Sequence, residues 1–168
     1  MTATSRFQTA RALLAAVDRA SYALIVVAMG AMAVIVALQV FLRYGLGASM
    51  DSAEELSRLA FVWAMFLAIP HGVRYGVHVG IDVLVNLFPE GLRRTLFRLM
   101  SGLGALLMAL VLYAAVFVTA DKWQELMPTI ELTAAVFYIA VLISATHSLL
   151  HLLLLTWGGE DTWKEVGA

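Results

Sequence analysis

Four long apolar runs, separated by short polar stretches, dominate the hydrophobic pattern of the chain. Each run is close to the ~20 residues that a helix needs to cross ~30 Å of hydrocarbon. The runs predict membrane-spanning helices over residues 20–42, 53–72, 99–120 and 133–157. We therefore expect an all-α membrane protein whose 168 residues form a single four-helix domain.

Two further segments are amphipathic rather than uniformly apolar. Residues 6–19 repeat apolar side chains at helical spacing, with Arg11 and Asp18 outside the apolar set. Residues 79–92 have a similar mixed character, and Pro89 would end or bend a helix there. We expect both segments to be short helices that lie on the membrane surface.

The second span starts in a group of charges and then loses them. Glu54, Glu55 and Arg58 lie in the first turns of an otherwise apolar helix. Ser52 and Glu55 have the spacing of a capping box, and acidic side chains suit the positive end of the helix dipole. This layout predicts a helix that begins among lipid headgroups and continues into the hydrocarbon.

Composition supports a lipid environment and excludes several functions. The chain is 62% apolar and only 14% charged, whereas soluble domains are about 25% charged. The net charge of −1 offers no concentrated basic surface for nucleic acid. The absence of cysteine excludes disulfides, thiolate metal sites and cysteine nucleophiles.

The arginine and lysine residues divide unequally between the two sides of the expected bundle. Eight of the eleven lie in the N-terminal tail, in the loop after the second span and in the C-terminal tail. The other side has Arg43, Arg58 and Lys122. The positive-inside rule therefore predicts cytoplasmic N and C termini. Glu54 and Glu55 would then face outward, into the periplasm of a Gram-negative cell.

Several polar or aromatic side chains near the outer side are candidates for contacts. Arg43, beside Tyr44, would anchor at the interface, pair with Glu54 or Glu55 across the short outer loop, or pair with a partner protein. Glu54 and Arg58 have the four-residue spacing of an intrahelical ion pair, which leaves Glu55 free for a contact with another subunit. Trp63 would contact lipid or pack in the core.

The four histidines suggest a different function. His147 and His151 lie four residues apart on one face of the fourth span, His71 ends the second span and His78 follows it. Paired histidines in membrane helices can ligate haem, so a haem-bearing, cytochrome b-like anchor subunit is an alternative. The simpler interpretation is hydrogen bonding at helix ends.

The spans otherwise lack the features of a transport pathway. No acidic or basic residue lies in the middle of a predicted span, and Pro70 is the only proline within one. Ion and proton pathways usually need such ionisable groups or broken helices. We therefore expect no catalytic site, no substrate site, no metal site and no cofactor in this chain.

The stretch QVFLRYGLGASMDSAEELSRLAFVWAMFLAIPHGVRYGVHVGIDVL, residues 39–84, resembles a known family. It is similar to the DctQ-like small membrane subunit of TRAP (tripartite ATP-independent periplasmic) transporters. The features that match are the following, in chain order: Gln39, Arg43, Tyr44, Glu54, Glu55, Leu56, Arg58, Phe61, Val62, Trp63, Arg74, His78, Val79 and Asp82. Four spans and this chain length also fit the family.

The resemblance implies a function that the residues alone do not give. It implies a subunit in the bacterial inner membrane that scaffolds a large transport subunit and helps to dock a periplasmic substrate-binding protein. The complete transporter would use a sodium gradient to import an organic acid. Arg43, Glu54, Glu55 and Arg58 would then support the outer contact surface, and Arg74, His78 and Asp82 would order the cytoplasmic turn. A tetraspan assembly factor without a transport role is a second alternative.

Overall fold

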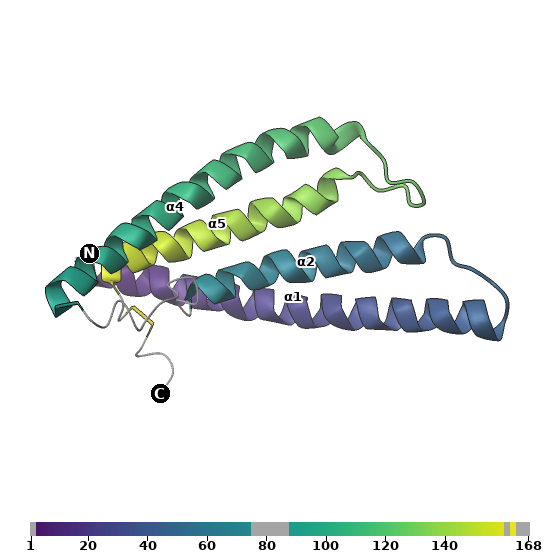
Figure 1. Cartoon of the computed structure of the whole chain (residues 1–168), viewed down its shortest axis with the longest axis horizontal. Helices are drawn as coiled ribbons and strands as arrows, with labels where there is room; N and C mark the ends of the chain where they lie inside the picture. Colours follow the sequence, from purple (N-terminus) through teal and green to yellow (C-terminus); the bar gives the residue numbers. More distant parts are fainter. Residues whose placement is uncertain (1–2, 75–87, 160–161, 164–168) are drawn as a thin grey trace.

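In the part of the chain that it describes, the computed structural model has four long helices that run along the long axis of the molecule (Figure 1). It describes residues 3–74, 88–159 and 162–163. In chain order the elements are α1 (Ala3–Gly45), α2 (Ala53–Arg74), α4 (Glu90–Asp121), the 3₁₀ turn η1 (Lys122–Gln124) and α5 (Ala135–Gly158). All four long helices are long and apolar enough to span a membrane, which confirms the predicted all-α membrane fold.

The helices form two antiparallel hairpins. α1 packs along α2, α4 packs along α5, and α2 and α5 are the principal contact between the two pairs. The loops 46–52 and 125–134 lie at one end of the bundle, which we call the loop end (Figure 1). The described starts of α1 and α4 and the ends of α2 and α5 lie at the other end, which we call the terminal end.

Small side chains allow the helices to approach one another closely. Ala135 and Ala140 of α5 are fully buried, and Ala64 of α2 is nearly so. Gly104 of α4 faces Leu152 so closely that an added Cβ would lie 3.2 Å from its side chain. Most large apolar side chains instead point outward. This arrangement is typical of membrane bundles, in which apolar surface faces lipid and small residues face the neighbouring helix.

The structure changes the expected boundaries at the beginning of the chain. A surface helix over residues 6–19 and a span over 20–42 were expected, but residues 3–45 form one unbroken helix. The physical reason is the direction of Asp18, which is buried against other helices rather than turned to water. At 43 residues, α1 is about 64 Å long, so part of it must extend beyond the ~30 Å hydrocarbon layer.

The remaining boundaries can be compared directly with the sequence expectation. α2 and α5 lie within about two residues of the expected 53–72 and 133–157, whereas α4 begins nine residues before the expected residue 99. Of the expected surface helix over 79–92, residues 79–87 lie outside the described residues and residues 90–92 belong to α4.

Candidate functional site

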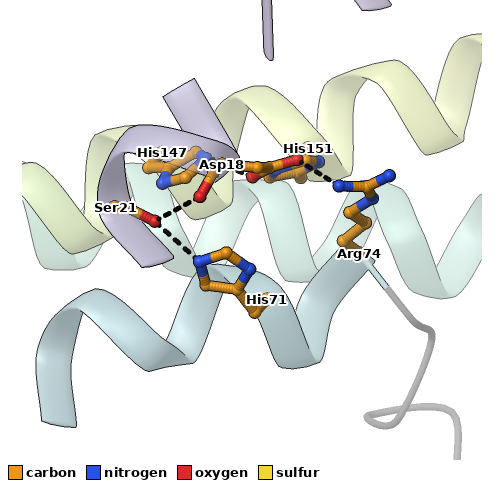
Figure 2. Close-up of polar contacts among 6 residues, drawn as sticks. All are labelled: Asp18, Ser21, His71, Arg74, His147 and His151. Carbon is orange, nitrogen blue, oxygen red and sulfur yellow. Dashed lines mark hydrogen bonds and ion pairs between the residues drawn. The ribbon is translucent and has the colours of Figure 1, made fainter. Parts of the chain in front are cut away.

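Six polar side chains from three helices converge near the terminal end of the bundle (Figure 2). α1 provides two of them, and α2 and α5 provide two each. We call this group the Asp18 cluster. Its members are Asp18, Ser21, His71, Arg74, His147 and His151.

The Asp18 carboxylate is the centre of the cluster. Its Oδ1 atom lies 2.9 Å from Nε2 of His147 and 2.9 Å from Nε2 of His151. Its Oδ2 atom accepts a hydrogen bond of 2.8 Å from Nη1 of Arg74. Only 2% of Asp18 and none of His151 is exposed. Both carboxylate oxygens are therefore engaged within the chain, by residues that lie 56 to 133 positions away in sequence.

A second contact joins α1 to α2 within the same cluster. The Ser21 hydroxyl lies 2.6 Å from Nε2 of His71 and donates to the backbone carbonyl of Asp18 at 3.3 Å. Figure 2 shows Ser21 between Asp18 and His71.

Trp163, from the segment after α5, packs against the cluster. The Arg74 guanidinium lies over its ring, 4.4 Å from the ring centroid, and the His151 ring centroid is 5.3 Å away. Arg11 of α1 also lies over this ring, at 5.8 Å. The indole therefore shields the Arg74 ion pair from water, and the contact adds a cation–π attraction.

The cluster has a structural consequence because it connects both hairpins. Asp18 lies in the first hairpin, whereas His147 and His151 lie in the second. A buried carboxylate is costly unless it is paired and hydrogen-bonded, and removal of one partner typically costs about 3–5 kcal/mol. The arrangement therefore fixes the rotation of α1 relative to α5. Asp18, His147 and His151 also have the ligand types and spacing to hold a metal ion.

The geometry does not favour the haem alternative. Nε2 of His147 and Nε2 of His151 both point at the same Asp18 oxygen, and Nε2 of His71 is occupied by Ser21. Two axial haem ligands must instead face each other across the macrocycle with free nitrogen lone pairs. His78, the fourth histidine in that hypothesis, lies outside the described residues.

A second group of polar contacts lies near the loop end. Glu55 of α2 accepts hydrogen bonds from the backbone N–H and the hydroxyl of Thr129, in the loop before α5. That loop is held by an isolated β-bridge between Leu126 and Thr133. Trp63 Nε1 donates to the backbone carbonyl of Val136 at 3.2 Å. These contacts tie α2 to the start of α5, and they show Trp63 packed between helices.

The structure corrects two expectations for the start of α2. The expected Glu54–Arg58 pair is absent among the described ion pairs, and the Arg58 guanidinium instead approaches Glu55 at 4.0 Å. Glu55 is not free, because it is 5% exposed and bound to Thr129. Among the described hydrogen bonds its carboxylate is joined to Thr129 and none joins it to Ser52, so the expected capping box is not formed there. Glu54 is the exposed carboxylate of the pair.

The remaining contact residues that the sequence predicted lie in different parts of the chain. Arg43 and Tyr44 are exposed at the loop end, and neither forms an ion pair with Glu54 or Glu55 in the described part of the chain. Arg74 turns into the Asp18 cluster. His78 and Asp82 lie outside the described residues, so their expected part in the cytoplasmic turn stays a prediction.

Sequence reasoning missed the central residue of the cluster. Asp18 was expected on the polar face of a surface helix, and Ser21 was not considered. Leu14, Asp18 and Ser21 have the spacing of one helix face. The structure shows that all three are buried. The shared spacing was therefore the signal in the sequence, because it groups Asp18 with the apolar Leu14 on one helix face.

Together, the fold and these contacts define a multi-pass α-helical membrane protein whose polar groups stabilise its own bundle. Comparison with known proteins identifies the group within that class. Residues 32–160 match the family described as Tripartite ATP-independent periplasmic transporters, DctQ component. The chain belongs to this family, as the sequence resemblance predicted.

Curated relatives support this membership. The chain is 31% identical over 118 residues to the C4-dicarboxylate TRAP transporter small permease protein DctQ of Rhodobacter capsulatus, covering 69% of this chain and 52% of that protein. It is 24% identical over 128 residues to a putative TRAP transporter small permease protein of Haemophilus influenzae, covering 76% and 78%. It is 26% identical over 101 residues to the ectoine TRAP transporter small permease protein TeaB of Halomonas elongata, covering 59% and 52%.

The matched length differs among these relatives. The chain spans about half the length of the first relatives that it matches. The family and the membrane fold follow from the comparisons, whereas substrate and partners require a separate argument.

Proposed function

We propose that the chain is the small subunit of a TRAP-type secondary transporter, where it scaffolds the large membrane subunit and helps to dock a periplasmic substrate-binding protein. The observation that carries this proposal is the family match over residues 32–160, combined with four apolar helices long enough to span a membrane. The scaffold role accounts for the exposed apolar surface as well as for the internal polar contacts.

The polar contacts of the chain suit a scaffold better than a pathway. Asp18 is the most deeply buried acidic side chain among the described residues, and Arg74, His147 and His151 already occupy both its oxygens. The described helices are continuous, and the positive-φ glycines Gly47 and Gly159 lie after helix ends. A substrate or ion site would need unsatisfied carbonyls or charges inside the bilayer.

The exposed apolar helix faces are the surface that would meet the large subunit or lipid. On α4, Leu103, Leu106, Leu110, Tyr113 and Phe117 are each more than half exposed and recur at helical spacing. Such a stripe is stable only in contact with lipid or another membrane helix. Packing against the large subunit would cover part of it.

The loop end carries the groups that would help to dock the binding protein. Arg43, Tyr44, Glu54 and Arg58 have exposed side chains there. Glu55 would act indirectly, by holding the loop at Thr129 in position. The uneven distribution of arginine and lysine supports a periplasmic loop end and cytoplasmic termini in a bacterial inner membrane.

The proposed reaction is sodium-driven uptake of an organic acid by the complete transporter. The relatives are named for C4-dicarboxylates and for ectoine. Since both oxygens of the buried Asp18 carboxylate contact side chains of this chain, substrate choice would belong to the other subunits.

The proposal is tested by coexpression with the large membrane subunit and the binding protein from the same genome. We expect this chain to copurify with the large subunit, and sodium-dependent uptake into proteoliposomes to require all three proteins. Uptake by the large subunit and binding protein alone, at the same rate, would contradict the scaffold function. Failure of the chain to copurify would contradict the proposed assembly.

A further inference from the structure

Three side chains of the Asp18 cluster each place one oxygen or nitrogen atom close to the other two. Asp18 Oδ1 lies 2.9 Å from each of the two histidine Nε2 atoms, and these nitrogens lie 3.2 Å from each other. His147 and His151 are one helical turn apart on α5, and all three residues are buried. The scaffold function proposed above does not require this triangle.

Hydrogen bonding does not satisfy all three contacts at once. An ionised carboxylate only accepts, so each Nε2 that bonds to Asp18 must carry a hydrogen. Both hydrogens then point at Asp18 Oδ1, and the two nitrogens lie 3.2 Å apart with no hydrogen bond between them. If one Nε2 instead lacks its hydrogen and accepts from the other, it loses its own bond to Asp18. One side of the triangle therefore lacks a hydrogen bond in either tautomer.

A bound cation would accept one lone pair from each of these three atoms, so all three atoms would be engaged at once. In a tetrahedral zinc site with bonds of about 2.0–2.1 Å, ligand atoms lie about 3.3 Å apart. The three separations in the cluster are within a few tenths of an ångström of that value. Two imidazoles and a carboxylate are also a ligand set that zinc commonly adopts.

We propose that Asp18, His147 and His151 form a binding site for a divalent cation of the zinc type. The bound ion joins α1 to α5 and fastens the two hairpins together at the terminal end of the bundle. Arg74 holds Asp18 Oδ2 and thereby fixes the orientation of the carboxylate. The three side chains occupy three positions of a tetrahedral site.

Two features of the cluster lower its affinity for zinc. The Arg74 guanidinium is a cation 2.8 Å from the same carboxylate, and it opposes the charge of the ion. Nδ1 of His151 is buried without a hydrogen-bond partner among the described residues, so the second ring nitrogen lacks the acceptor that usually orients a ligating imidazole. The test therefore covers a range of free zinc concentrations.

The experiment uses the purified chain in detergent, stripped with a chelator and then dialysed against buffered zinc. We expect about one zinc per chain by elemental analysis and a higher unfolding temperature in the zinc-loaded sample. His147→Gln should weaken zinc binding by at least about 100-fold, because it removes a direct ligand. His71→Gln is the matched control: its ring contacts Ser21 rather than the Asp18 carboxylate, so zinc binding should be retained.

The wild-type measurement alone can overturn the proposal, even if a variant folds poorly. Absence of zinc from the wild-type chain across the concentration range would mean that the cluster is held by hydrogen bonds and the Arg74 ion pair only. Equal zinc binding by wild type and a folded His147→Gln variant would place the ion elsewhere and would also overturn it.

Discussion

Asp18 of α1 and Arg74 at the end of α2 form a buried ion pair with an N–O distance of 2.8 Å, and the same carboxylate contacts two histidines of α5. One side chain thus connects three helices and both hairpins. Its position explains why α1 continues without a break through the segment that was expected to lie on the membrane surface.

Loss of the Asp18 carboxylate should destabilise the bundle. Asp18→Ala removes the buried carboxylate that contacts Arg74, His147 and His151, and the expected cost is about 3–5 kcal/mol in the free energy of unfolding. Thermal unfolding of the purified chain in detergent, followed by circular dichroism, measures the change. Asp51→Ala is the control, because Asp51 is exposed at the loop end and should change stability little. Equal stability of both variants would contradict the central role of Asp18.

Glu55 should control the loop before α5. Glu55→Ala removes the acceptor for the Thr129 amide and hydroxyl, and hydrogen bonds to a charged group are worth about 1.5–3 kcal/mol. Amide hydrogen exchange in residues 125–133 should therefore become about 10- to 100-fold faster if it proceeds by local opening. Glu54→Ala, at the exposed neighbouring position, should leave this exchange unchanged. Identical exchange in the two variants would show that Glu55 does not hold the loop.

The same residue also gives a prediction for the complete transporter. Glu55→Lys places a cation in a buried site, so it should release the loop and lower uptake by the assembled complex. The ion affinity of the large subunit should not change, because Glu55 is proposed to act at the docking surface. Uptake at the wild-type rate, with normal expression of the variant, would contradict the proposed role of Glu55 in docking.

Close packing along α5 should make its alanines sensitive to enlargement. Ala140→Leu forces new atoms into a fully buried position, which typically costs about 1–3 kcal/mol. Ala31→Leu makes the same change at an exposed position of α1 and should be nearly neutral. Unfolding temperatures of the two purified variants provide the comparison. A neutral Ala140→Leu would mean that α5 has more space around it than the structure gives.

The orientation can be tested directly because the chain has no cysteine of its own. A single cysteine at Ser49, in the loop after α1, should react with a membrane-impermeant thiol reagent added to cells with a permeabilised outer membrane. A single cysteine at Gln8, near the N-terminus, should react only after the inner membrane is opened. Both positions are exposed in the structure. The opposite labelling pattern would reverse the proposed topology.

Much of the fold was predictable from local sequence. α2 lies at residues 53–74 and α5 at 135–158, close to the apolar runs that predicted them. Such runs are reliable because backbone groups in lipid must be hydrogen-bonded within the segment, so a long apolar stretch has to be helical. The start of the second span was also foreseeable, because Ser52 and the carboxylates after it favour a helix N-terminus.

The candidate site was less predictable, since its residues meet only through tertiary packing. Spacing alone predicted a pair between Glu54 and Arg58 and left Glu55 free. In the structure α2 packs against the loop before α5, and Glu55 therefore binds Thr129 and lies near Arg58. A four-residue spacing shows which side chains share a helix face, but it does not show which face turns toward a neighbour.

The lipid environment, the four helices and the family resemblance follow from the linear pattern, because they depend on the length and order of apolar and polar runs. The contact of Asp18 with His147 and His151, more than a hundred residues away, is visible only in the folded chain. The physical reason is that helix rotation is set by the sum of all interhelical contacts, and no local stretch of sequence contains that sum.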